Sequence, residues 1–230
     1  RSLHDARPLS TSSSRNFENL MPRPVKITYR IAPTPAETAL AAAQLFTRAA
    51  IDAVAKRNRA RIAISGGITP KAMFQLLADP TQPFLKQIPW ASLDLYWVDE
   101  RCVLPTDPDS NYRMTNEALL SRVPLPAARI HRIEGELDPE VAAARYESVI
   151  RNSFKLEGAE TPTFDLILLG MGDDGHTASL FPHTEALDDL SHIAIANHVP
   201  QKGTWRITLT WPVINQGREV AFLIEGADKA

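Results

Sequence analysis

The chain has 230 residues, 44% hydrophobic and 23% charged, and is long enough to bury the core of one α/β domain. Its formal net charge of −2 gives no overall attraction for nucleic acid or for an acidic membrane, so an anionic ligand would need a local basic pocket. Cys102 is the only cysteine, which excludes an intrachain disulfide and a cysteine-rich metal site. No apolar run approaches the roughly 20 residues of a membrane span. We therefore expect a cytoplasmic protein that binds neither nucleic acid nor membrane.

The first residues are rich in serine and arginine and contain no apolar stretch typical of a secretory signal. We interpret residues 1–22 as a disordered leader and residues 23–230 as a single domain. A transit segment is the weaker alternative, because such segments are poor in acidic residues and this one contains Asp5 and Glu18.

Beyond the leader, the hydrophobic pattern alternates between the period of strands and the period of helices. Strands are predicted over 25–31, 61–65, 93–98, 164–169, 193–196, 207–210 and 220–224. Helices are predicted over 35–56, 70–78, 111–122 and 138–153. Apolar strands that alternate with helices are typical of buried parallel sheets. The pattern predicts an α/β fold with a three-layer, open, mostly parallel Rossmann-like sheet and helices on both faces.

A glycine-containing loop joins the strand predicted at 61–65 to the next helix, which Thr69 is expected to cap. The backbone amides of such a loop and the positive end of the helix dipole attract anions. The loop has neither the Gly-x-Gly-x-x-Gly of dinucleotide sites nor the Gly-Lys-Ser/Thr of a Walker loop. We predict that Ser65, Gly66, Gly67 and Thr69 contact an anionic ligand, although an ordinary turn would also fit.

Two arginines lie beside predicted strands. Arg101 follows the strand at 93–98, and Arg206 precedes the strand at 207–210. A guanidinium is permanently charged and its planar fork suits phosphate, so Arg101 is a candidate phosphate ligand. The neighbouring acidic residues Asp99 and Glu100 are expected to hold Arg101 in place. A solvated surface charge cluster is the alternative interpretation.

Residues 170–183 follow the apolar strand predicted at 164–169 and read Gly-Met-Gly-Asp-Asp-Gly-His-Thr-Ala-Ser-Leu-Phe-Pro-His. Ligands of open α/β sheets bind at the carboxyl ends of strands, and histidine side chains exchange protons near neutral pH. We predict that His176 is catalytic and that Asp174 orients its ring or stabilises its charged form. A tight turn with a solvated histidine is the structural alternative.

Two other hydrolytic mechanisms lack sequence support. The Gly-x-Ser-x-Gly turn of nucleophilic-serine esterases is missing, and Ser179 lies after the histidine rather than on such a turn. The histidines show neither His-Glu-x-x-His nor another compact metal-ligand spacing. We expect neither a metal nor an organic cofactor.

Four sequence strings occur in the same order as in the 6-phosphogluconolactonases, and the chain resembles this family from residue 25 to residue 230. They are Ser-Gly-Gly-x-Thr-Pro at 65–70, Ser-Asn-Tyr at 110–112, Asp-Gly-His-Thr-Ala-Ser-Leu-Phe-Pro at 174–182 and Arg-Ile-Thr-Leu-Thr at 206–210. The resemblance implies the fold of the phosphosugar isomerases and lactonases. It also implies a carboxylic ester hydrolase that converts 6-phospho-D-glucono-1,5-lactone to 6-phospho-D-gluconate in the oxidative pentose phosphate pathway.

The resemblance assigns roles to the predicted site. His176 would be the general base that activates water, and Arg101, Arg206 and Lys202 would hold the substrate phosphate. The backbone amides of 65–67 or those of 170–175 would stabilise the oxyanion, and the sequence does not decide between these two loops. A phosphosugar lactone is thus the expected small-molecule partner, and the protein is expected to be a monomer or a weak homo-oligomer.

The sequence departs from the family pattern at two places. Gly203 and Thr204 replace the prolines that usually follow the family lysine, so the alignment of Lys202 is less secure. Family members usually continue for a strand and a helix beyond the Gly-Ala-x-Lys-Ala segment at 226–230, so we expect the domain to lack its C-terminal strand and helix.

Two alternative functions share the fold. The related glucosamine-6-phosphate deaminase/isomerases continue the Asp-Gly-His turn with Ile-Ala-Phe-Asn-Glu, whereas Thr-Ala-Ser-Leu-Phe-Pro follows His176 here. They also carry Glu-Tyr in place of Glu100 and Arg101. A non-catalytic phosphosugar sensor is the other alternative, and the presence of both Asp174 and His176 argues against it.

Overall fold

The computed structural model describes residues 26–226, and the chain divides into two units at residues 31 and 32. In the first unit, residues 26–31 form neither a helix nor a strand, so the strand predicted at 25–31 is wrong for these residues. A strand requires a hydrogen-bonded partner, and no described strand pairs with this segment. Ile27 and Ile31 are accordingly 68% and 93% exposed. Residue 25 and the predicted leader lie outside the described residues.

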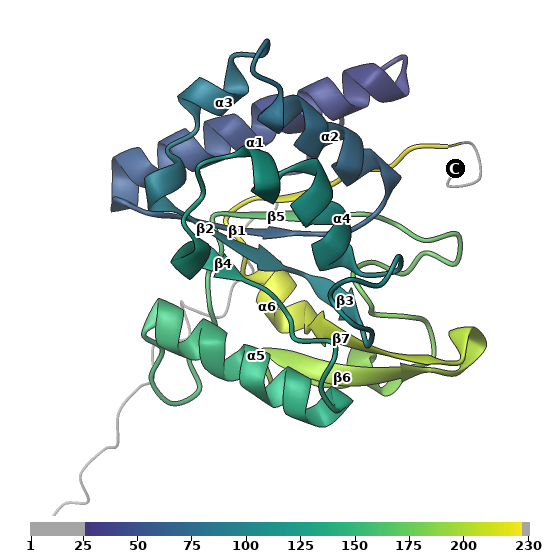
Figure 1. Ribbon diagram of the computed structural model, residues 1–230. Helices are drawn as coiled ribbons and strands as arrows, with labels where there is room; N and C mark the ends of the chain where they lie inside the picture. Colours follow the sequence, from purple (N-terminus) through teal and green to yellow (C-terminus); the bar gives the residue numbers. More distant parts are fainter. Residues whose placement is uncertain (1–25, 227–230) are drawn as a thin grey trace, which may run out of the picture. The chain divides into compact units, whose positions relative to one another are not determined.

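The second unit is built around a five-stranded parallel sheet with the order β4-β2-β1-β5-β8 (Figure 1). Its strands are β1 (Ala60–Ile64), β2 (Leu93–Trp97), β4 (Ile130–His131), β5 (Leu166–Leu169) and β8 (Val220–Phe222). The central strands are almost wholly buried, as expected for apolar strands covered on both faces. Because all pairings are parallel, the carboxyl ends of the strands share one edge of the sheet.

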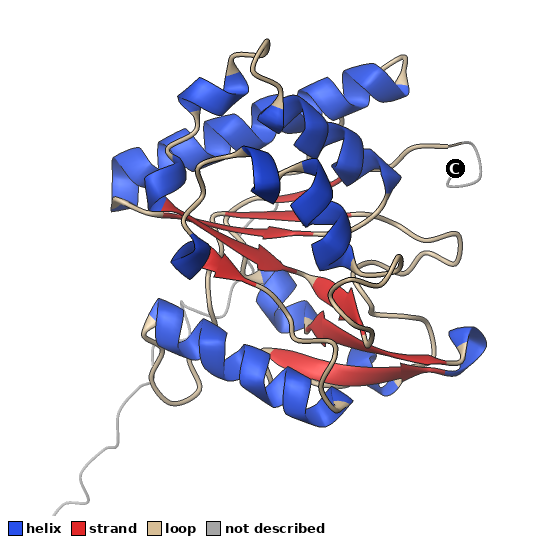
Figure 2. Ribbon diagram, in the orientation of Figure 1, coloured by secondary structure: helices blue, strands red, loops and turns tan. Residues whose placement is uncertain are grey.

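Helices cover both faces of this sheet (Figures 1 and 2). One face carries α1 (Pro35–Arg57), α2 (Ile68–Ala78), α3 (Phe84–Gln87) and α4 (Asn111–Ala118). The other face carries α5 (Pro139–Phe154) and α6 (Trp211–Asn215). The arrangement confirms the predicted α/β fold with a mostly parallel central sheet between helical layers. No helix among residues 26–226 combines the length and the apolar character needed to cross a bilayer.

Two helix ends differ from the sequence prediction. The helix predicted at 70–78 begins at Ile68, and its cap is Gly67 rather than Thr69. Gly67 has a φ of 114°, which glycine adopts readily because it has no side chain. The chain therefore enters the helix at Ile68, two residues before the predicted start at Pro70. The helix predicted at 111–122 ends at Ala118, and a separate 3-10 turn covers Leu120–Arg122.

A second sheet has three antiparallel strands in the order β3-β7-β6 and was not predicted. Its strands are β3 (Asp99–Arg101), β6 (Ala194–Val199) and β7 (Thr204–Leu209). Val98 joins the two sheets, because its N–H donates to Ile64 and its carbonyl accepts from Leu209, both at 2.8 Å. The predicted strands near 193–196 and 207–210 are present, but a hairpin pairs them outside the parallel sheet.

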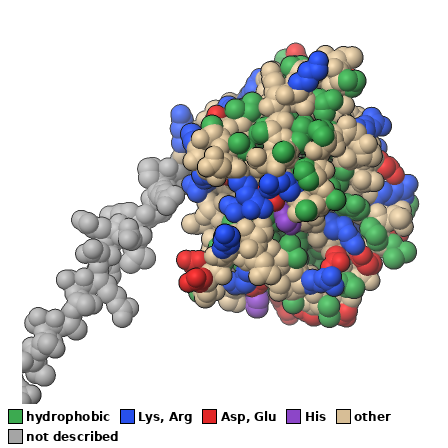
Figure 3. Space-filling view, turned by 60° about the vertical axis from the view of Figure 1, so that its left-hand side comes forward, with side chains coloured by type: hydrophobic (Ala, Val, Ile, Leu, Met, Phe, Trp, Pro, Cys, Tyr) green, Lys and Arg blue, Asp and Glu red, His purple; other side chains and the backbone are tan. Residues whose placement is uncertain are grey.

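Two buried carboxylates neutralise arginines where the parallel strands begin. The Asp94 carboxylate accepts hydrogen bonds from Arg59, Arg129 and His131, the last two at 3.0 Å. The Asp165 carboxylate forms an ion pair with Arg57 at 2.7 Å. Figure 3 turns the left-hand side of Figure 1 forward and shows Lys and Arg side chains grouped beside a His side chain. Asp94 and Asp165 lie at the amino ends of β2 and β5, so their ion pairs are at the edge of the sheet opposite the carboxyl edge, where ligands of such sheets bind.

Candidate active site

His176 lies in the turn that follows the carboxyl end of β5. The Asp174 carboxylate accepts hydrogen bonds from the backbone N–H of His176 at 3.1 Å and from its ring Nδ1. The Gly172 N–H donates to the His176 carbonyl at 2.8 Å, which closes the turn. The imidazole also stacks on Phe181, with ring centroids 3.8 Å apart. Two contacts therefore hold the imidazole ring, the hydrogen bond at Nδ1 and the stacking of one ring face on Phe181.

The charge of Asp174 sets the orientation of the imidazole proton. Partial burial alone would raise the pKa of the Asp174 carboxyl, but the hydrogen bonds from His176 outweigh it and lower this pKa. The carboxylate is therefore ionised at neutral pH and accepts a hydrogen bond from the Nδ1–H group. In the neutral imidazole, Nε2 is then the nitrogen with a free lone pair, as a general base requires.

Gly172 is required by the close approach of the histidine ring. A Cβ atom at this position would lie 2.1 Å from Nδ1 and 2.2 Å from Cε1 of His176. Gly175 has a φ of 80°, which also favours glycine. These two glycines shape the turn around the ring, whereas a Cβ on Gly170 would meet nothing within 4 Å.

Arg101 and Arg206 are directly paired across β3 and β7. Burial lowers the pKa of the Arg206 guanidinium, and the charge of Arg101 lowers it further. Arg101 Nη1 donates to the carbonyl of Asp109. Two cations held side by side are unfavourable unless an anion lies between or beside them. The pair is therefore a suitable site for a phosphate group.

Among residues 26–226, neither Asp99 nor Glu100 forms an ion pair with the Arg101 guanidinium, but Glu100 Oε1 accepts from the Arg101 backbone N–H at 2.8 Å. Consecutive strand residues point to opposite faces, so Glu100 points away from the arginine pair. Its carboxylate accepts from the backbone N–H groups of Asn111 and Tyr112, both at 2.8 Å, at the start of α4. Burial raises the pKa of Glu100, although these backbone hydrogen bonds oppose the effect. Glu100 therefore anchors α4 rather than the guanidinium.

The histidine turn rests on the sheet face that carries the arginine pair. Ser179 donates from Oγ to the Asp99 carboxylate at 2.7 Å and from its N–H to Thr208 Oγ1 at 3.2 Å. Asp99 and Thr208 are themselves paired across β3 and β7. Arg101 comes two residues after Asp99 and Arg206 two residues before Thr208, which is about 7 Å along each strand, and alternate strand residues share a face. The histidine turn and the arginine pair therefore lie on the same face of the second sheet.

The Ser65–Gly67 loop joins this region through Asn111. The Asn111 side chain donates to the Asp99 carbonyl at 3.0 Å. A Cβ on Gly66 would lie 1.8 Å from Asn111 Oδ1, so the loop lies directly against this amide. The Ser65 hydroxyl is buried and has no hydrogen-bond partner among the described residues. Thr69 is buried in the first turn of α2, where no side chain caps the helix.

Lys202 is the predicted site residue that the structure does not bring into this cluster. It is exposed in the 3-10 turn between β6 and β7. Its ammonium group forms no hydrogen bond or ion pair with any of residues 26–226. The insecure alignment at this position, where glycine and threonine replace prolines, agrees with this separate location.

Sequence reasoning missed the buried polar residues that connect the predicted segments. Asn111 and Ser179 lie in two of the strings that resemble the lactonase family, but the sequence predicts no contact of either residue with Asp99. Ser179 is 1% exposed, and its hydroxyl donates to Asp99, so it cannot act as a nucleophile towards substrate. Contacts between distant segments leave no periodic signal in a single sequence, which is why these residues were not found.

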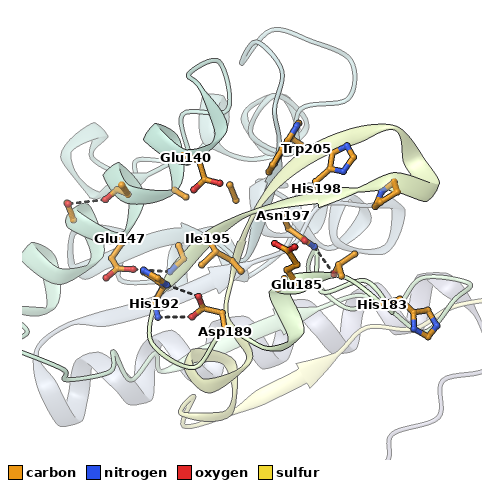
Figure 4. Close-up of a pocket in the computed structure, with 18 of the residues that line it drawn as sticks. Glu140, Glu147, His183, Glu185, Asp189, His192, Ile195, Asn197, His198 and Trp205 are labelled. Carbon is orange, nitrogen blue, oxygen red and sulfur yellow. Dashed lines mark hydrogen bonds and ion pairs between the residues drawn. The ribbon is translucent and has the colours of Figure 1, made fainter.

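A separate groove with a volume of about 820 Å³ lies beside α5 and β6 (Figure 4). Glu140, Glu147, His192 and Trp205 are among the residues that line it. The Glu147 carboxylate accepts from the N–H of Ile193 at 2.8 Å, and it forms part of the packing between α5 and the second sheet. None of the predicted site residues lines this groove. It is not the candidate active site, despite its size.

The fold and the site define an α/β protein in which a hydrogen-bonded Asp–His pair and two directly paired arginines follow strands of the parallel sheet at its carboxyl edge. The family model of glucosamine-6-phosphate isomerases/6-phosphogluconolactonase matches residues 33–230, and the chain belongs to this family.

The chain is similar to a protein and a solved structure that carry the lactonase name, and to a structure named devB protein. A 6-phosphogluconolactonase of Synechocystis is 44% identical over 178 residues, which cover 77% of this chain and 71% of the relative. The crystal structure of a 6-phosphogluconolactonase from Thermotoga maritima is 30% identical, with a TM-score of 0.72 and coverage of 84% and 82% of the two chains. The crystal structure of a devB protein is 37% identical, with a TM-score of 0.78 and coverage of 87% and 81%.

Proposed function

We propose that this protein hydrolyses 6-phospho-D-glucono-1,5-lactone to 6-phospho-D-gluconate, with His176 as the general base. The similarity to 6-phosphogluconolactonases supports the reaction, which belongs to the oxidative pentose phosphate pathway. One observation carries the assignment of the base. The Asp174–His176 pair lies in a turn anchored to the sheet face on which Arg101 and Arg206 are paired.

The reaction begins with a water molecule between Nε2 of His176 and the lactone carbonyl. Nε2 takes a proton from the water as its oxygen bonds to C1, and the carbonyl oxygen becomes a tetrahedral oxyanion. The oxyanion then collapses, the bond between C1 and the ring oxygen breaks, and the imidazolium returns its proton to that ring oxygen. The product is the open-chain acid, which ionises in water, and the histidine is again neutral. Acid–base assistance of this kind contributes about 10² to 10⁴ in rate.

Asp174 supports both halves of this cycle. As an ionised carboxylate it keeps the proton on Nδ1 and stabilises the imidazolium when the ring is doubly protonated. It remains the hydrogen-bond partner throughout and does not itself take the proton.

The substrate phosphate binds Arg101 and Arg206, and its charge relieves the repulsion between the two guanidinium groups. The substrate also contacts the loop before α2 and the first turn of that helix, through Ser65, Gly66, Gly67 and Thr69. The buried Ser65 hydroxyl has no hydrogen-bond partner among the described residues and is available to the substrate. Lys202 lies in the turn before β7 and forms no hydrogen bond or ion pair among the described residues, so its ammonium group is available as a third cation for the phosphate. The amides of 65–67 and of the turn 170–175 are the two candidate donors to the oxyanion.

A coupled assay tests the function. Freshly prepared lactone is supplied to the purified chain, and the product is oxidised by 6-phosphogluconate dehydrogenase while NADPH formation is followed. We expect hydrolysis above the spontaneous rate, and His176→Ala lowers kcat by about 10² to 10⁴. His198→Ala is the matched control, because this exposed histidine lies on β6 beside Trp205 and outside the cluster.

Three outcomes would contradict the proposal. Undiminished activity in His176→Ala removes the proposed base. Release of ammonia from glucosamine 6-phosphate without lactone hydrolysis makes the protein a deaminase. Binding of the phosphosugar without turnover of either substrate makes it a sensor.

We further propose that the enzyme works in the cytoplasm as a monomer or a weak homo-oligomer and does not bind nucleic acid. The formal net charge of −2 supports the last point, because nucleic-acid binding depends on a strongly basic surface. Light scattering after size-exclusion chromatography tests the oligomeric state, and a gel-shift titration with duplex DNA tests the absence of binding.

A further inference from the structure

We propose that Ser179 and Asn111 are positioning residues, which fix the histidine turn and the Ser65–Gly67 loop relative to each other through Asp99. This inference rests on the proposed lactonase function and assigns the two residues separate effects on kcat and KM. Neither side chain is itself a catalytic residue, because each acts through the backbone segment that it holds.

Ser179 anchors the histidine turn with every polar group it has. Its hydroxyl donates to the Asp99 carboxylate at 2.7 Å, and its N–H donates to Thr208 Oγ1 at 3.2 Å. Its carbonyl accepts from Asn197 Nδ2 at 2.8 Å. All of these partners belong to the second sheet. The turn is therefore attached to the sheet at a single, fully hydrogen-bonded residue.

The position of Ser179 connects this anchor to the histidine ring. It lies between His176 and Phe181, whose rings are stacked at 3.8 Å. Ala178, next to it, has a φ of 50°, which residues with a side chain rarely adopt. Such a conformation persists only where surrounding contacts hold it in place. Loss of the Ser179 anchor would let the backbone at Ala178 relax and displace the ring.

Asn111 holds the opposite side of the site. Its Nδ2 donates to the Asp99 carbonyl at 3.0 Å, and its side chain occupies the space beside Gly66 where a Cβ would otherwise lie. Asn111, which lies against the loop, thus contacts Asp99 at its carbonyl, and Ser179, which belongs to the turn, contacts the same residue at its carboxylate. Asp99 is buried in β3, two positions before Arg101.

Ser179 and Asn111 hold different parts of the site, so we expect the loss of one to change kcat and the loss of the other to change KM. Ser179 fixes the group that transfers the proton, so its loss changes the chemical step. Asn111 fixes the loop that binds the anion, so its loss changes substrate affinity. A misplacement of about 1 Å in a reacting group costs up to about 10² in rate, and uniform binding losses raise KM without lowering kcat.

The test uses the full chain in the coupled lactonase assay. We expect Ser179→Ala to lower kcat by about 10- to 100-fold with KM within about threefold of wild type. Asn111→Ala is expected to raise KM by about 10-fold and to change kcat by less than about threefold. Ser148→Ala is the control, because this exposed hydroxyl donates only to Ala144 within α5.

Thr208→Val serves as a second variant for the anchor. Valine keeps the shape of threonine but removes the acceptor of the Ser179 N–H, so the same selective loss of kcat is expected even if Ser179→Ala does not fold. Unfolding temperatures are measured for all variants, and the kinetics are repeated well below the lowest of them.

Several outcomes would overturn the inference. Wild-type kcat in both Ser179→Ala and Thr208→Val excludes the anchor. Equal changes of kcat and KM that disappear at low temperature indicate a structural role alone. If wild type itself does not hydrolyse the lactone, the proposed function fails rather than the assignment of these two residues.

Discussion

Arg101 and Arg206 lie directly opposite each other in the antiparallel pairing of β3 and β7, so two cations share one face of a small sheet. Like charges at such positions destabilise a sheet by up to about 1 kcal/mol. The repulsion between the two guanidinium groups lowers the stability of the free protein, and an anion bound between them would relieve it.

The exchange Arg206→Gln separates these two effects. We expect KM for the lactone to rise by about 10- to 100-fold, because a charge-assisted hydrogen bond is lost. The free energy of unfolding without ligand should rise by about 0.5–1 kcal/mol, because the repulsion and the burial of charge are relieved. Steady-state kinetics and urea unfolding measure the two quantities. A variant with both higher KM and lower stability would contradict this explanation.

Asp174→Asn is expected to lower kcat by about 10² with little change in KM, because the amide neither fixes the Nδ1 proton nor stabilises the imidazolium. The pKa of Asp174 is lowered in the folded protein, so its carboxylate persists as pH falls and is lost only below the ordinary value of about 3.9. At pH 8 the Asp174 carboxylate is fully ionised, so the full loss of kcat should be seen there. Steady-state kinetics of both proteins at pH 8 measure it, and an unchanged kcat in Asp174→Asn would refute the role of the carboxylate.

Gly172→Ala places a Cβ about 2 Å from the histidine ring and should displace it. We expect kcat to fall by about 10². Gly170→Ala is the comparison, since its Cβ meets nothing within 4 Å and its amide is retained. Circular dichroism confirms that both variants fold. Equal kinetics in the two alanine variants would show that the turn does not constrain the ring.

Cys102 should be unreactive although it lies next to Arg101. Burial raises the pKa of its thiol to about 11, and the charge of Arg206 only partly opposes this. At pH 8 its thiolate fraction is about 10² below that of an ordinary cysteine, so alkylation should be slower by a similar factor. The rate of iodoacetamide labelling, measured by mass spectrometry against free cysteine, tests the expectation. Rapid labelling of the folded enzyme would contradict it.

Asp94→Asn should destabilise the protein by about 2–4 kcal/mol at pH 7, because Arg59 and Arg129 lose their shared carboxylate. Burial alone would raise the pKa of Asp94, but the hydrogen bonds from Arg59 and His131 hold it far below its usual range. The stabilisation is therefore present above about pH 3.9 and is lost as pH falls further. Urea unfolding of both proteins between pH 7 and pH 3 measures the difference, which should narrow only below pH 4. A constant difference across this range would argue against ionic stabilisation.

The sequence predicted the elements that depend on local patterns. Helix α1 begins where threonine and proline predicted, and Thr34 Oγ1 accepts from the Glu37 N–H at 3.3 Å. The apolar run Leu166–Leu169 predicts the buried strand that precedes the histidine turn, although the strand begins two residues later than the predicted 164 because Asp165 lies before it. The strand predicted at 25–31 fails for a related reason, since an alternating pattern forms a strand only where another strand accepts its hydrogen bonds.

By itself, the sequence determined the α/β class and the segments that carry His176, Arg101 and the Ser65–Gly67 loop, because periodicity and short motifs are local properties of a chain. Only the tertiary structure decided how these segments meet. The second sheet pairs Arg101 with Arg206, and Asp99 contacts Ser179 of the turn through its carboxylate and Asn111, beside the loop, through its carbonyl. These contacts join residues far apart in the chain, and their hydrogen bonds form only once the strands have paired and water has been excluded.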